Sequence, residues 1–193
     1  MNVTIELAVS TFGAKAKNKL ANKAATGQPE DQLRAPFEQL LTQLGELCHF
    51  PQGTVVAVGE SSVSDLKTRP DYAVSVHNAL AGFVELKAPG KGADPRKFKD
   101  PHDKEQWEKL RSLPNLIYSD GNAFSLWQNG ELVGAVLNLI GDIESSGSKL
   151  EAPAGLLSLF ENFFQWEPIP PRSAKDLAQS TARLCRLLRD EVT

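Results

Sequence analysis

The sequence predicts an α/β protein in which helices flank a mixed β-sheet. Two strand-like runs, residues 71–76 and 82–87, are separated by a segment short enough for a hairpin loop. A helical pattern follows at residues 102–113, and further strand-like runs joined by an Asn-Gly turn come after it. A hairpin followed by a helix and more strands is the order expected of a mixed sheet covered by helices.

The first elements precede the hairpin. Residues 14–25 are rich in lysine and alanine, and they fit either a basic helical arm that contacts phosphate or a solvated segment. Residues 33–47 carry an apolar stripe at helical spacing, with Pro36 in an early turn of the expected helix. Residues 54–58 are rich in valine, which is typical of a strand.

The hairpin carries three charged residues, Asp71, Glu85 and Lys87. A turn centred near Ala79 would place Lys87 opposite Asp71. Asp71 and Glu85 would then be diagonal neighbours on one face, roughly 7–8 Å apart at the backbone. At that separation both carboxylates can reach a single cation.

These residues have the chemistry of a metal-dependent phosphodiesterase. Magnesium is held in proteins by one or two carboxylates together with waters and substrate phosphate oxygens. Asp71 and Glu85 would supply the carboxylates, and the backbone carbonyl of Leu86 a further oxygen; Mn²⁺ is expected to substitute. Lys87 would orient the attacking water or stabilise the charge that develops on phosphorus. An exposed strand with ordinary surface charges is the alternative, because a Pro-Asp dipeptide and a Glu-x-Lys triplet each arise by chance.

The segment after the hairpin adds positive charge. Its cations are Lys91, Arg96, Lys97, Lys99 and Lys104. Phosphate backbones bind such patches, so we expect these residues to contact the DNA backbone. A solvated charged loop is the alternative, because Asp94, Asp100 and Asp103 dilute the positive charge.

The helical pattern at residues 102–113 ends at Pro114. Gln106, Leu110 and Leu113 share one face, while opposite charges four residues apart suit the solvent side. Gln106 is therefore a polar residue on an inward stripe. From periodicity alone, a boundary amide bonded to nearby backbone is the simpler interpretation.

The strand-like runs after this helix are residues 115–119, 123–127 and 132–136. An Asp120-Gly121 break separates the first two. The Asn129-Gly130 dipeptide between the last two is a strong hairpin signal.

The C-terminal part is helical in pattern. Residues 145–148 form a Ser/Gly loop or linker, and residues 156–164 an apolar helix that prolines end. Ser173 then caps a final helix through Leu188. These helices could pack on the core and lead into a neighbouring domain.

Composition limits the possible partners. The formal net charge of −3 is unusual for a protein that holds DNA through its whole surface, so DNA contact should be local or completed by another domain or subunit. No apolar run approaches the length of a membrane span, and the N-terminus lacks a signal-peptide core. Cys48 and Cys185 are expected to be free thiols in a reducing cytoplasm. The histidines lack metal-ligand spacing, so zinc is not expected.

Together these residues resemble the PD-(D/E)XK nuclease superfamily. The resemblance rests on Arg69-Pro70-Asp71-Tyr72, Glu85-Leu86-Lys87, Gln106 and residues 113–121. More narrowly, they are similar to the nuclease module that opens large restriction-modification polypeptides, where it precedes an adenine-specific DNA methyltransferase and a target-recognition region. The resemblance spans about residues 31–136. It implies a restriction-endonuclease-like core with a central mixed β-sheet flanked by helices, plus C-terminal helices.

The resemblance also implies residue roles. Asp71 and Glu85 become metal ligands, Lys87 the catalytic lysine, and Gln106 the helix residue that supports the site. The family often places an acid on the first core helix, for which Glu38 is the best match and Glu60 a weaker one. The alternative for Glu38 is a solvated helix acid.

We therefore expect three segments: a basic N-terminal arm or helix at residues 1–30, the nuclease core at 31–140, and a helical extension at 141–193. The expected activity is that of a magnesium-dependent DNA endonuclease domain, the cleavage module of a restriction-modification or phage-defence enzyme. Expected partners are double-stranded DNA, methyltransferase and target-recognition domains or subunits, and a second copy, because cutting both strands requires two active sites.

Two other functions fit the same residues. One is a repair or recombination nuclease that selects DNA by shape. The other is a non-catalytic module that docks DNA or protein, although such a module has no need of charged residues in a strand, where they are disfavoured.

Overall fold

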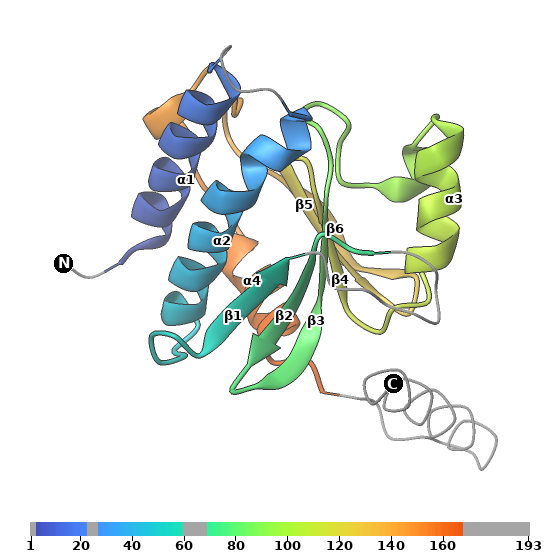
Figure 1. Ribbon diagram of the computed structural model, residues 1–193. Coiled ribbons are helices and arrows are strands. Elements are labelled where there is room, and N and C mark those ends of the chain that lie inside the picture. Colours follow the sequence, from blue (N-terminus) through green and yellow to red (C-terminus); the bar gives the residue numbers. More distant parts are fainter. Residues whose placement is uncertain (1–2, 23–26, 60–68, 168–193) are drawn as a thin grey trace.

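The computed structural model describes residues 3–22, 27–59 and 69–167, which form one sheet flanked by helices (Figure 1). The helices are α1 (Ile5–Leu20), α2 (Pro29–Leu47), α3 (Pro101–Leu110) and α4 (Leu156–Phe164), with short 3-10 turns η2 (Pro95–Lys97) and η3 (Gly147–Lys149). The strands are β1 (Val55–Gly59), β2 (Tyr72–Val76), β3 (Ala79–Leu86), β4 (Leu116–Ser119), β5 (Ala123–Gln128) and β6 (Glu131–Asn138).

The sheet is mixed, as predicted. Its strand order is β1-β2-β3-β4-β5-β6, and all neighbours are antiparallel except β3 and β4. These two run parallel, with Leu86 opposite Ser119, because α3 carries the chain back to the start of β4. The carboxyl ends of β3 and β4 therefore meet at one edge of the sheet.

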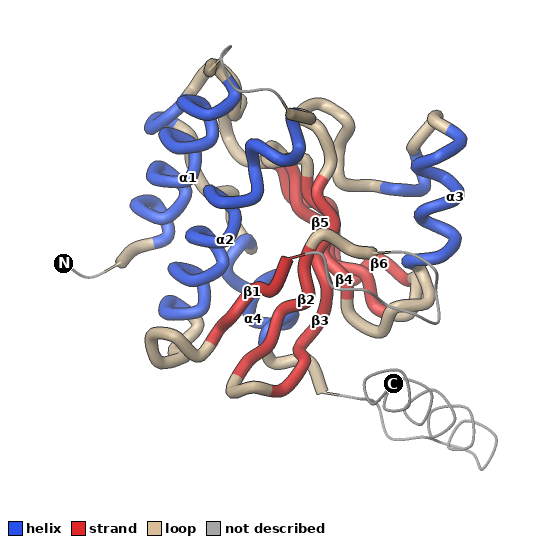
Figure 2. The backbone as a smooth tube through the Cα atoms, viewed as in Figure 1, coloured by secondary structure: helices blue, strands red, loops and turns tan. Residues whose placement is uncertain are grey.

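Helices cover the two faces of the sheet unequally. The helices α1 and α2 lie on one side and α3 on the other (Figures 1 and 2). Strand residues alternate between the two cores: Val84 and Ile117 join the core that contains α1, α2 and α4, whereas Phe83 and Tyr118 join the smaller core around Trp107 of α3. Glu85 shares the α3 side, where it can meet residues of that helix.

The first hairpin is tighter than predicted, and its predicted register is wrong. The turn is His77-Asn78, whose φ angles of 51° and 63° are both positive, as in a two-residue type I′ turn. β3 consequently begins at Ala79, where we expected the middle of a loop. Histidine and asparagine adopt the left-handed conformation more readily than most residues, which explains the short turn.

The corrected register brings the two acids closer. Tyr72 pairs with Val84, so one further step places Asp71 directly opposite Glu85 rather than diagonal to it. Directly opposed residues of an antiparallel pair have Cβ atoms roughly 4.5–5.5 Å apart. The correction therefore favours a shared function for the two carboxylates.

The N-terminal segment belongs to the core. α1 begins at Ile5, where the Thr4 hydroxyl accepts a hydrogen bond from the Leu7 N–H, and not near residue 14. Its residues Ala8, Val9, Phe12 and Ala16 are fully buried in the main core. α2 begins at Pro29, so Pro36 lies inside the helix rather than in an early turn.

The remaining elements agree with the sequence pattern. β4, β5 and β6 occupy the three predicted runs, and Asn129-Gly130 turns with φ angles of 52° and 83°. α4 occupies the predicted residues 156–164, and Cys48 is a buried free thiol. Glu60, Cys185 and the predicted helix at residues 173–188 lie outside the described residues. None of the described helices is both long and apolar enough to cross a membrane.

Candidate functional site

A polar cleft of about 490 Å³ opens at the edge where β3 and β4 end. It is lined from α2 by Arg34, from the hairpin by Asp71, Glu85 and Lys87, and from α3 by Asp103 and Gln106. The cleft thus gathers side chains from three regions of the sequence.

Local structure explains this gathering. Asp71 directly precedes β2, Glu85 is the next-to-last residue of β3, and Lys87 directly follows that strand. On the other wall, Asp103 and Gln106 are three residues apart on α3, so they share one face of the helix. Asp100 caps α3 by accepting hydrogen bonds from two backbone N–H groups of its first turn.

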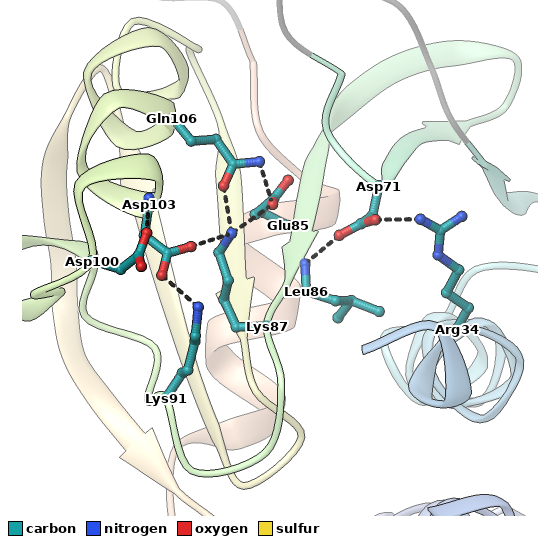
Figure 3. A network of polar contacts seen from close by, with 9 residues as sticks. All are labelled: Arg34, Asp71, Glu85, Leu86, Lys87, Lys91, Asp100, Asp103 and Gln106. Carbon is teal, nitrogen blue, oxygen red and sulfur yellow. Dashed lines mark hydrogen bonds and ion pairs between the residues drawn. The ribbon is translucent and has the colours of Figure 1, made fainter. Parts of the chain in front are cut away.

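Lys87 is held by three acceptors (Figure 3). Its Nζ lies 3.1 Å from Glu85 Oε1 and 3.2 Å from Asp103 Oδ1, and it donates to Gln106 Oε1. An ammonium group has three donors, so these contacts use them all. Burial alone would lower the pKa of Lys87, but Glu85 and then Asp103 outweigh it and raise the pKa above its usual value. The side chain is therefore a charged, fixed ammonium.

Glu85 has one satisfied and one unsatisfied oxygen. Oε1 accepts hydrogen bonds from Lys87 and, at 2.7 Å, from Gln106 Nε2, whereas the buried Oε2 has no partner among the described residues. Burial, followed by the charge of Asp71, raises the pKa of Glu85 to about 7. A buried acceptor without a partner is costly, which points to a ligand at Oε2.

Both oxygens of Asp71 have partners. Oδ2 accepts the backbone N–H of Leu86 at 2.7 Å, and Oδ1 lies 2.8 Å from Arg34 Nη2. Burial raises the pKa of Asp71, although the Leu86 N–H and the Arg34 guanidinium oppose the shift. Asp71 is thus fixed toward the end of β3, next to Glu85.

A loop places Lys91 at the mouth of the cleft. Lys91 Nζ lies 2.5 Å from Asp103 Oδ2, so Asp103 bridges Lys87 and Lys91. The buried carboxylate of Asp120, just after β4, accepts the backbone N–H groups of Gly90 and Gly92 and so fixes this loop. Burial would raise the pKa of Asp103, but its bonds to Lys91 and Lys87 outweigh it and lower the pKa.

The donor set of the cleft suits a hard cation. Asp71, directly before β2, and Glu85, in the neighbouring β3, offer carboxylates, and Glu85 Oε2 has no partner in the described segments. Within the described ranges, no group of three or more His, Cys, Asp and Glu residues is placed to hold a metal. Magnesium, however, needs only one or two carboxylates, because carbonyls, waters and substrate oxygens complete its shell.

The structure brings most of the predicted site residues together. Asp71, Glu85, Leu86, Lys87 and Gln106 all line the cleft. Gln106 bonds to the side chains of Glu85 and Lys87 rather than to nearby backbone.

Other predicted residues lie elsewhere. Glu38 accepts a hydrogen bond from the Tyr72 hydroxyl at 2.9 Å and is not part of the cleft lining. Of the predicted DNA contacts, only Lys91 lines the cleft. Arg96 and Lys97 form ion pairs with Asp94, while Lys99 and Lys104 are exposed.

Three polar residues of this region were missed as site residues. Asp103 could have been found, because it precedes Gln106 by three residues and therefore shares its helix face. Asp120 was noted only as part of a turn and of the segment 113–121, and the four backbone N–H groups that it accepts belong to the loop after β3 and to residues 122–123 at the start of β5. Nothing in the sequence pattern distinguishes Arg34 from the other charged residues of α2.

The comparisons with known proteins bear on the fold. The sequence matches no protein-family profile, and the comparison with curated proteins found no match. Among solved structures, the chain is similar to a chain of DrdV in a cryo-EM structure of its complex with DNA, with a TM-score of 0.55 and 23% sequence identity. The match covers 84% of this chain and 14% of the DrdV chain. The fold is a restriction-endonuclease-like α/β core with a mixed sheet flanked by helices.

Proposed function

We propose that this chain is a magnesium-dependent DNA endonuclease domain that hydrolyses phosphodiester bonds. The observation that carries the proposal is the pair of buried residues Glu85 and Lys87, bridged by half-buried Gln106 beside Asp71, in a polar cleft where one glutamate oxygen lacks a partner among the described residues. Burying charged groups is costly and adds little stability, so such a group favours a functional role.

The residues of the cleft have distinct roles in this proposal. Asp71, Glu85 and the backbone carbonyl of Leu86 would hold Mg²⁺, with Mn²⁺ as a substitute. The bound ion would polarise the phosphate and lower the pKa of a water. Lys87 would orient that water or stabilise the charge that develops on phosphorus. Gln106 fixes Glu85 and Lys87 relative to each other, because it donates to one and accepts from the other.

DNA as the substrate has two supports. The cleft holds four cations that can contact phosphate, Arg34, Arg69, Lys87 and Lys91, beside six acids whose charge a bound divalent cation would partly offset. The chain of similar fold, DrdV, was solved in a complex with DNA. Exposed Lys99 and Lys104, with Arg96 and Lys97, would add backbone contacts outside the cleft.

We further propose that the domain serves as the cleavage module of a restriction-modification or phage-defence enzyme. The similar fold makes up 14% of the DrdV chain, so this fold occurs within a much longer polypeptide. Methyltransferase and target-recognition domains or subunits would then choose the target. A second copy would supply the second active site for a double-strand break.

A nicking assay on supercoiled plasmid at low salt tests this function. With Mg²⁺ or Mn²⁺ the wild type should nick and linearise the plasmid, and Lys87→Ala and Asp71→Ala should each lose cleavage by at least about a hundredfold. Lys109→Ala is the matched control, because Lys109 bonds Glu105 on the solvent side of α3. Cleavage that persists in both cleft variants, or that needs no metal, would contradict the proposal. DNA binding without cleavage, indifferent to Mg²⁺ and to Asp71→Ala, would indicate a docking module instead.

A further inference from the structure

The carboxylate of Asp71 has two partners of different kinds. The Leu86 N–H on Oδ2 belongs to the strand backbone and stays in place, whereas Arg34 on Oδ1 is a long side chain from α2 (Figure 3). The Arg34 side chain is 31% exposed, and that of Asp71 is 14% exposed. The contact with Arg34 is therefore the one that can open.

A divalent cation and a guanidinium group compete for this carboxylate. If Asp71 holds a metal ion, the positive charges of the metal and of Arg34 meet at the same oxygen, where they repel each other. Moving to another anion would then relieve the repulsion between Arg34 and the metal ion. A second carboxylate is already close, since Arg34 Nε lies 3.3 Å from Asp31 Oδ1 on the same helix.

The position and chemistry of Arg34 suit a phosphate. Arg34 lines the cleft from the α2 wall, whereas Lys91 lines it from the loop before α3. A guanidinium group offers five donors in a planar fork, which matches the geometry of carboxylate and phosphate oxygens alike. Asp71 thus accepts from the Arg34 Nη2 group, which a phosphate oxygen could bond in its place.

We propose that Arg34 is a phosphate-binding residue of the cleft that stays on Asp71 until a divalent cation takes that carboxylate, and then binds the DNA backbone. This inference rests on the proposed function. In the protein without metal, Arg34 balances the charge of Asp71 and weakens cation binding. In the protein with metal and DNA, Arg34 contributes to substrate affinity, so cation and DNA bind cooperatively.

Two measurements on Arg34→Gln test whether Arg34 exchanges Asp71 for the DNA backbone when a divalent cation binds. The first is the affinity for Mn²⁺ alone, by calorimetric titration of the full chain without DNA. The variant should bind Mn²⁺ about tenfold more tightly than the wild type, the change expected from one charge-assisted contact. The second is steady-state cleavage of a short duplex, in which KM should rise about tenfold while kcat stays close to the wild-type value.

A conservative variant and a control complete the test. Arg34→Lys retains the charge without the fork, so both effects should be intermediate, and it replaces Arg34→Gln if that variant melts at a much lower temperature. Arg111→Gln is the control, because Arg111 pairs with exposed Glu108 outside the cleft lining. It should change neither Mn²⁺ affinity nor KM.

The outcomes separate this inference from the proposed function. In one outcome the wild type binds Mn²⁺ and cleaves DNA, but the Arg34 variants bind Mn²⁺ no more tightly or keep the wild-type KM. The proposed role of Arg34 is then wrong, whereas the proposed nuclease function is retained. If the wild type binds no Mn²⁺ and cleaves nothing, both are wrong.

Discussion

Glu85 illustrates how much of the site depends on one buried side chain. It is 3% exposed, bonds a fixed ammonium through one oxygen, and finds no partner for the other within the part of the chain that the structure describes. With a pKa raised to about 7, it holds or releases a proton near neutral pH. Since a metal ligand must be deprotonated, cation binding should weaken as the pH falls below about 7.

The first prediction concerns Glu85 without metal. In EDTA, the folded protein holds a proton on Glu85 up to about pH 7, whereas the unfolded chain releases it near its ordinary value of 4.5. The folded state therefore binds more protons in this window, and the Glu85 contribution to the free energy of unfolding falls as pH rises from about 4.5 to 7. The slope should be at most about 1.4 kcal/mol per pH unit.

Urea unfolding of wild type and Glu85→Gln at several pH values measures this contribution, because the amide cannot titrate. The stability of the wild type relative to the variant should fall steadily across the window. Glu144→Gln, which changes an exposed carboxylate of a loop outside the cleft lining, is the control. A constant difference between wild type and Glu85→Gln would show that Glu85 keeps its ordinary pKa in the folded protein, and would contradict the prediction.

At the scale of single residues, the sequence indicated several residues that share the cleft, but not all of the partners that they contact there. Asp71, Glu85, Lys87 and Gln106 were predicted from short motifs, because the motif residues lie within or beside regular elements. Arg34 and Asp103 were missed as partners, since their contacts join elements that are far apart in sequence. Only the packing of α2 and α3 around the hairpin decides which charges meet.

At the scale of elements, α3 is the wall on which catalysis would depend. It has ten residues, and its first turn carries Asp103 and its second Gln106. The Asp100 side chain accepts hydrogen bonds from the N–H groups of His102 and Asp103 at 2.9 and 3.2 Å. The cap therefore fixes the turn that contacts Lys87.

The second prediction follows from this cap. Asp100→Ala should destabilise the protein by about 1 kcal/mol and should also lower the cleavage rate, because the start of α3 loosens around Asp103. Thr4→Ala is the matched control, since Thr4 caps α1 through the Leu7 N–H and lies outside the cleft lining. It should cost similar stability and leave cleavage unchanged at a temperature where both variants are folded. Thermal unfolding and plasmid nicking measure the two effects, and equal loss of cleavage in both variants would contradict this role of α3.

The order and type of the elements followed from periodicity and turn residues, whereas the register of the hairpin did not. The sequence predicted a five-residue loop, whereas His77-Asn78 closes the hairpin alone. The irregularity in strand pairing between Val74 and Ser75 was not predicted either. Register depends on turn geometry, and a shift of the pairing by one residue moves every following side chain to the other face of the sheet. The direct opposition of Asp71 and Glu85 therefore required the structure.

At the scale of the whole molecule, acids slightly outnumber Lys and Arg, and the same holds for the lining of the cleft. The chain carries 21 Lys and Arg against 24 Asp and Glu, so long-range attraction to DNA is weak. Several cleft cations are already paired with acids of the cleft, Arg34 with Asp71 and Lys91 with Asp103. Such a domain should bind DNA weakly and in a salt-dependent way, and it suits a polypeptide in which other parts select the target.

The central claim is that Asp71 and Glu85 together hold the divalent cation on which cleavage depends. Titration of Mn²⁺ into the full chain without DNA, followed by the loss of the free-ion signal in electron paramagnetic resonance, tests it most directly. Wild type should bind Mn²⁺, and Asp71→Asn and Glu85→Gln should each weaken binding by at least about tenfold. Asp94→Asn, which removes another buried carboxylate, one that pairs with Arg96 and Lys97 outside the cleft lining, should leave it unchanged. Wild-type binding that both cleft variants retain, or no binding by the wild type, would contradict the account.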